Sequence, residues 1–162
     1  MKMTDLIPAE DLRALQQELS ERYGLNADIM DADGKRLFGA TFGNKLCRAI
    51  RDDEKGFGGI CVPAGQMFTH LMKQGEPFHE ECDAGMLRVA VPVVVDGEVI
   101  GSIGGCGLVP PGGEADPFAI GMMSDIEEAA ATDMAGKLKP AAEGRVEEIQ
   151  AYIRKRINEL KQ

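Results

Sequence analysis

The order of apolar and polar residues along the chain predicts helices that alternate with short strands. Residues 8–23 carry leucines at helical spacing, with Pro8 at a favoured first position and Gly24 just past the end. Two short strand candidates, 27–30 and 36–40, follow this segment. The N-terminal part of the chain therefore predicts one amphipathic helix that leads into a sheet.

Two further helices are predicted in the next segment. Asn44 is a suitable N-cap for a helix whose inward positions include Cys47. The glycine-rich residues 56–59 are expected to end that helix, and Pro63 is expected to open a second helix that stops near Gly75.

The strongest strand signal lies in the middle of the chain. Residues 88–95 and 98–103 are apolar and flank Asp96-Gly97, a pair typical of a two-residue hairpin turn. A preceding strand is predicted at 77–82, joined through a turn at Ala84-Gly85. These segments predict three consecutive antiparallel strands.

The C-terminal part predicts a helix from residue 116 to near 131 and a longer one over 143–160. In the longer helix, apolar residues recur at intervals of three and four along a narrow stripe that includes Ile153. Such a stripe is typical of the seam between two helices, so we expect a homodimer through this helix. The alternative is a helix that packs on its own domain.

Composition limits the class of partner. The chain has 162 residues and a formal net charge of −9, which disfavours nucleic acid and anionic membrane surfaces as partners. It shows neither a cationic leader nor a run of eighteen apolar residues, so we expect a soluble cytoplasmic protein. A single domain is expected from this length.

Four cysteines are the main candidates for chemistry: Cys47, Cys61, Cys82 and Cys106. No two of them form a CxxC pair, and cytoplasmic thiols stay reduced, so neither a local zinc knuckle nor a disulfide framework is predicted. If the fold brings them together, four thiolates suit zinc or a [4Fe–4S] cluster. The alternative is four separate buried thiols that pack as small apolar side chains.

The predicted hairpins give a geometric reason to expect convergence. With two-residue turns, Cys82, Leu87 and Cys106 fall in one row across three strands, with their thiols on the same face. The two cysteine Cα atoms would then lie about 10 Å apart, which is too far for a disulfide but suitable for a shared metal centre. A bulge at Pro92 would turn Cys106 to the other face.

The other two thiols are predicted at helix starts, where Cys47 follows Asn44 and Cys61 precedes Pro63. Positive partial charge at a helix N-terminus lowers a thiol pKa, which favours the thiolate that binds metals. A second possible ligand set is three thiols with His79 or Asp83.

No enzyme motif is legible in the chain. The glycines of 101–107 lack the GxGxxG spacing and no helix follows them, so a dinucleotide site is rejected. We explain these glycines by close approach of a ligand or a helix to a bare strand. Neither a Ser-His-Asp nor a Cys-His arrangement is visible, and His70 is predicted to face solvent.

Taken together, a set of segments resembles the PocR-type sensory domain, a variant of the PAS-like sensor fold. The similarity runs from about Leu12 into the C-terminal helix and rests on Leu46–Arg51, Cys61, Glu76–Gly85, Ala90–Glu98 and Gly101–Gly105. The resemblance implies an α+β, PAS-like domain with about five antiparallel strands and helices on one face, to which N- and C-terminal helices are added. It divides the chain into an N-terminal helix (1–24), a PAS-like sensory core (25–110) and C-terminal helices of the same domain (111–162).

The resemblance also bears on the cysteines and on signalling. Cys47, Cys61 and Cys82 fall on cysteine positions of the family, whereas Cys106 stands where a non-cysteine polar residue is expected. Family members usually precede DNA-binding or kinase modules, but this sequence shows no output domain. It is therefore expected to signal through an unidentified partner or its own dimer.

Three functions follow from these observations. The first is a stand-alone sensory module with a metal or iron–sulfur centre on the four cysteines, which signals redox state or a small ligand. The second is a metal-free small-molecule sensor whose thiols line an apolar pocket. The third is an enzyme with a cysteine nucleophile, disfavoured because no base is visible.

Overall fold

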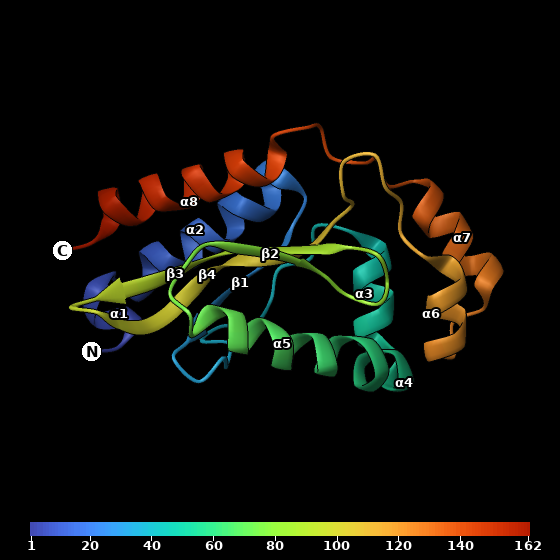
Figure 1. Cartoon of the computed structure of the whole chain (residues 1–162), viewed down its shortest axis with the longest axis horizontal. Coiled ribbons are helices and arrows are strands. Elements are labelled where there is room, and N and C mark those ends of the chain that lie inside the picture. Colours follow the sequence, from blue (N-terminus) through green and yellow to red (C-terminus); the bar gives the residue numbers. More distant parts are fainter.

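The computed structural model describes residues 1–162 and contains one four-stranded antiparallel sheet (Figure 1). The strands lie in the order β1-β4-β3-β2, with bounds β1 Asn26–Asp31, β2 Phe78–Glu81, β3 Leu87–Val95 and β4 Glu98–Leu108. The predicted α+β class and the antiparallel sheet are confirmed. The predicted fifth strand at 36–40 makes only one bridge, between Met30 and Arg36, so the strand count is corrected to four.

Helices account for most of the remaining chain. Their bounds are α1 Met3–Leu6, α2 Ala9–Tyr23, α3 Lys45–Asp52, α4 Glu54–Gly56, the π-helix η1 Phe57–Cys61, α5 Val62–Met72, α6 Pro117–Met123, α7 Glu128–Gly136 and α8 Arg145–Leu160. The predicted helices at 8–23 and 143–160 are confirmed as α2 and α8. The helix expected over 116–131 is divided into α6 and α7. No helix is long and apolar enough to cross a lipid bilayer.

One face of the sheet is covered by α2 and α8, which lie side by side above it in Figure 1. The apolar stripe of α8 belongs to this core, and Ile149 and Ile153 have no exposed surface. The interpretation of the stripe as the seam of a homodimer is therefore wrong, because the stripe packs on its own sheet. A homodimer through α8 would have to use the other side of the helix.

The opposite face of the sheet is covered by α5, with α3 beyond it (Figure 1). The core helices α3 and α5 thus cover one face, while the N- and C-terminal helices α2 and α8 cover the other, as expected for a sensory core flanked by terminal helices. Strand β3 is buried on both sides, with Val89 and Val91 toward α2 and α8, and Arg88 and Ala90 toward α5. A strand buried on both faces explains its nearly continuous apolar sequence.

The hairpin between β3 and β4 has the predicted turn but not the predicted register. Both turn residues have positive φ (51° and 79°), as a type I′ turn requires. Val94 pairs with Val99, but Val93 pairs with Gly101 because a bulge adds one residue to β4. This slip sends Cys106 to the face that Arg88 shares, the outcome expected from a bulge beside Pro92.

The glycine-rich residues 56–59 do not end a helix. They continue it, so that α4, η1 and α5 follow one another without a break from Glu54 to Met72. A π-turn adds one residue to a helix without unwinding it. Cys61 and Pro63 therefore lie inside a continuous helix, and the predicted second helix start is corrected.

Candidate functional site

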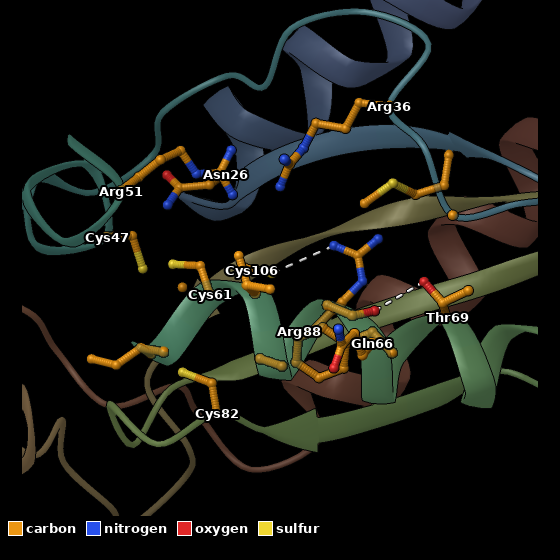
Figure 2. A pocket seen from close by; sticks show the side chains of 18 of the residues that line it. Asn26, Arg36, Cys47, Arg51, Cys61, Gln66, Thr69, Cys82, Arg88 and Cys106 are labelled. Atoms are coloured by element: carbon orange, nitrogen blue, oxygen red, sulfur yellow. Dashed lines mark hydrogen bonds between the residues drawn. The ribbon is translucent and has the colours of Figure 1, made fainter. Parts of the chain in front are cut away.

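A cavity of about 530 Å³ lies between the Arg88 face of the sheet and the helices α3, η1 and α5 (Figure 2). Of its 26 lining residues, 15 are hydrophobic, so most of the wall is apolar. Large apolar side chains on this wall include Ile50, Ile60, Phe68, Met72, Phe78 and Met86. A mostly apolar cavity with a few polar groups is typical of a small-ligand site.

The four cysteines all line this cavity, although each comes from a different part of the fold. Cys47 lies on α3, Cys61 at the end of η1, Cys82 directly after β2 and Cys106 on β4. Figure 2 shows the four side chains around the same end of the cavity. The structure thus brings the four thiols to one cavity, and they do not lie in separate parts of the core.

Local contacts hold α3 against the end of β4. The Asn44 side chain accepts a hydrogen bond from the Cys47 backbone N–H at 2.7 Å, as predicted for an N-cap, and donates to the Gly107 carbonyl oxygen at 2.9 Å. Gly107 has a φ of +95° and a Cβ there would lie 3.2 Å from the Cys47 sulfur. A glycine at this position lets the Cys47 thiol approach the strand that carries Cys106.

Two further glycines of β4, Gly101 and Gly104, allow neighbouring strands to pack closely. A Cβ on Gly104 would overlap the Val89 carbonyl oxygen, and one on Gly101 would overlap the Met30 carbonyl oxygen. Close contact between strands explains why these two positions are glycine, and at Gly101 the side chain of Met3 in α1 also approaches closely, as expected for a helix against a bare strand.

The predicted row of Cys82, Leu87 and Cys106 is wrong in register. Leu87 pairs with Leu108 across the hairpin, and the turn before β3 has three residues, since the Cys82 backbone N–H donates to the Met86 carbonyl oxygen at 2.9 Å. Cys82 and Cys106 reach one cavity because both sit beside the Arg88 face. Cys82 and Cys106 therefore lie near one another as predicted, but through a different strand register.

The sulfurs surround a space and do not meet at a point. No group of three or more His, Cys, Asp or Glu side chains is close enough in this structure to share one metal ion. His79 and Asp83 are exposed and do not line the cavity, so the second predicted ligand set is not assembled. His70 is exposed, as predicted.

Burial dominates the electrostatics of the thiols. It raises the pKa of Cys47 well above its ordinary value, and the nearby Cys106 and Cys82 thiolates would raise it further. Burial also raises the pKa of Cys61 to about 11, against an opposing effect of Arg51. The expectation that helix N-termini lower these values is wrong, because desolvation is the larger effect and Cys61 is not at a helix start.

A buried ion pair adjoins the thiols. Arg88 Nη2 donates to Asp28 Oδ1 at 2.7 Å and Arg88 Nη1 donates to Asp28 Oδ2 at 3.1 Å, and both side chains are at most 2% exposed. Arg88 Nη1 also donates to the Cys106 sulfur at 3.4 Å. Burial would lower the pKa of Arg88, but the Asp28 carboxylate raises it above its ordinary value, so the guanidinium stays charged.

Sequence reasoning missed Arg88 and Asp28. Arg88 is the single charged residue of the otherwise apolar strand β3, whereas Asp28 is one of two aspartates in β1. A lone charge at such a position signals a buried pair or a ligand contact, although the sequence alone does not say which residue is the partner.

Comparison with known families fits this geometry. The family model described as the sensory domain found in PocR matches residues 5–160. The chain belongs to the PocR sensory domain family. This membership confirms the resemblance seen in the sequence and makes the chain a sensory domain of the ligand-binding kind. Searches of curated proteins and of solved structures return no match.

Proposed function

We propose that this PocR sensory domain holds an iron–sulfur cluster through Cys47, Cys61, Cys82 and Cys106, and signals redox state or binding of a small ligand. The observation that carries the proposal is the position of the four thiols around one end of a single cavity. A [4Fe–4S] cluster is bound by four cysteine thiolates that commonly come from distant parts of a chain.

The spacing of the thiols supports a cluster over a single zinc ion. Zinc lies about 2.3 Å from each of four sulfurs, which must then nearly touch one another. A cluster has its own volume, and its ligands stand around it. Thiols that line a cavity without meeting at one point fit the second geometry better.

The charges around the thiols also suit a cluster. A [4Fe–4S] core with four thiolates is an anion, and Arg88, which donates to the Cys106 sulfur, and Arg51, which acts on Cys61, are cations beside the sulfurs. Hydrogen bonds to cluster sulfurs tune the reduction potential. The Arg88 contact with Cys106 would therefore help to set the potential at which the cluster is oxidised or reduced. Zinc remains the alternative metal for the same ligands.

The position of Cys61 suggests how a change at the centre would be transmitted. Cys61 ends the π-helix η1, which continues directly into α5. π-turns occur often at functional sites. Loss or oxidation of the centre would release Cys61 and allow α5 to move against the sheet, toward an output partner or a second copy of the chain.

A metal-free small-molecule sensor is the second candidate, favoured by the largely apolar wall. A cysteine-nucleophile enzyme is disfavoured. The raised pKa values of Cys47, Cys61 and Cys82 oppose thiolate formation, and neither histidine lines the cavity.

Single Cys→Ser variants test the proposed ligand set. We expect Cys61→Ser and Cys106→Ser, prepared without oxygen, to lose most of their iron and acid-labile sulfide. Met86→Leu is the matched control, because it removes a cavity sulfur 3.7 Å from the Cys47 sulfur without removing a thiol. Unchanged iron in Cys106→Ser would reduce the ligand set to three thiols, and unchanged iron in both variants would contradict the proposal.

A further inference from the structure

The cavity has a second end that the thiols do not occupy. Figure 2 shows Arg36 and Arg88 pointing toward each other across this end, with Gln66 and Thr69 on the α5 side. Ser102 lines the same cavity from β4 and is 1% exposed. These polar groups line the part of the cavity away from Cys47 and Cys61, whereas Asn26 and Arg51 line the part beside Cys47 (Figure 2).

Arg36 is held so that most of its donors remain free. Its Nε donates to Asp28 Oδ2 at 3.2 Å, while its two terminal nitrogens have no hydrogen-bond partner in the protein. The side chain is 31% exposed and lines the cavity. A guanidinium anchored through Nε presents its terminal N–H groups as a fork, the geometry that binds a carboxylate.

The charge at this end favours a monoanion. Arg36 and Arg88 share one buried counterion, Asp28, so these three side chains together carry one net positive charge. Asp33 also lines the cavity, but it is exposed and its field is screened by water. A dianion such as phosphate would leave a buried negative charge without a partner, whereas a monocarboxylate would be neutralised.

The neighbouring wall suits a short apolar chain. Phe68, Met72, Phe78 and Met30 line the cavity, and the Arg88 guanidinium lies 5.7 Å from the centroid of the Phe68 ring. We propose that the polar end of the cavity binds a small monocarboxylate, with its carboxylate on Arg36 and its alkyl group against these side chains. As a signal, this ligand rests on the proposed sensory function.

Arg88 connects the two ends of the cavity. One guanidinium contacts Asp28 and the Cys106 sulfur, and Asp28 also holds Arg36. A carboxylate on the terminal nitrogens of Arg36 neutralises that guanidinium and weakens its attraction for Asp28, which strengthens the Asp28–Arg88 pair and changes the N–H···S contact to Cys106. Binding of a carboxylate at the polar end would thereby change the surroundings of the Cys106 thiol.

Isothermal titration of the purified full chain with butyrate tests the proposal, with butyramide as the neutral isostere and inorganic phosphate as the dianion, at constant ionic strength. We expect saturable butyrate binding at least about tenfold tighter than butyramide or phosphate binding, as for a charge-assisted hydrogen bond. Arg36→Gln should weaken butyrate binding at least about tenfold. Arg48→Gln is the control, because it removes an exposed arginine that does not line the cavity.

Three results would overturn the proposal: no butyrate binding, equal binding of butyramide, or full binding by Arg36→Gln. Iron and sulfide measured on the same samples keep the two claims apart. A chain that binds butyrate but holds no iron would sink the proposed cluster alone. A chain that holds iron but does not bind butyrate would sink the carboxylate site alone.

Discussion

Arg88→Met is expected to lower the free energy of unfolding by about 3–5 kcal/mol, the usual cost of breaking a buried ion pair. Arg88 and Asp28 are at most 2% exposed, and Arg88 makes both short contacts to the Asp28 carboxylate. Without Arg88, Asp28 keeps only the single contact from the half-buried Arg36. The buried carboxylate would then be charged without adequate neutralisation, as denaturant unfolding should reveal.

Two further variants separate charge from packing. Arg36→Met should cost about 1 kcal/mol or less, because its side chain is partly exposed and Asp28 keeps its stronger partner. The double variant Asp28→Leu/Arg88→Met should recover much of the lost stability, since no buried charge remains. A loss below about 1 kcal/mol for Arg88→Met alone would contradict this account of the ion pair.

Ile153→Glu is expected to unfold the domain, with a cost above about 4 kcal/mol, because it places an unpaired charge in a closed core. Ile153 has no exposed surface and belongs to the core between α8, α2 and the sheet. Circular dichroism should show loss of helix. Lys155→Glu, on the exposed side of the same helix, should leave the signal unchanged.

The same variant distinguishes the two interpretations of α8. If the apolar stripe were a dimer seam, Ile153→Glu would give a folded monomer at half the original mass by light scattering. An unfolded chain is the result that the packing of α8 on its own sheet predicts.

The sequence predicted those elements whose signals are local. Asp96-Gly97 determines the hairpin turn and Asn44 caps α3, because each depends on backbone geometry within a few residues. The register beyond Val94 could not be read, since the bulge depends on how β4 packs against both neighbours. This bulge turns Cys106 to the Arg88 face of the sheet, and not to the Leu87 face that two-residue turns predict.

The glycine-rich segment shows how tertiary packing overrides local preference. Residues 56–59 were predicted to break a helix, yet Gly56 packs against the Ile50 carbonyl oxygen and Gly59 against the Met123 carbonyl oxygen. A Cβ would lie 3.0 and 3.1 Å from these atoms. The glycines here permit close approach of α3 and α6 and do not end the helix.

At the site, the sequence identified the cysteines as candidates but did not predict the residues that surround them. The four thiols could be recognised as candidates because few other residues in the chain carry such chemistry. The ion network of Asp28, Arg36 and Arg88 joins residues up to sixty positions apart, so no short motif marks it. The raised thiol pKa values also follow from burial, which only the fold determines.

The most direct test of the proposed centre is one anaerobic preparation of the unmodified chain, with its visible spectrum and its iron, sulfide and zinc contents. We expect broad absorbance near about 400 nm, with iron and sulfide in the ratio of a [4Fe–4S] cluster. A colourless protein with zinc would replace the cluster by a zinc site. A colourless protein free of both metals would contradict the claim that these thiols hold a metal centre.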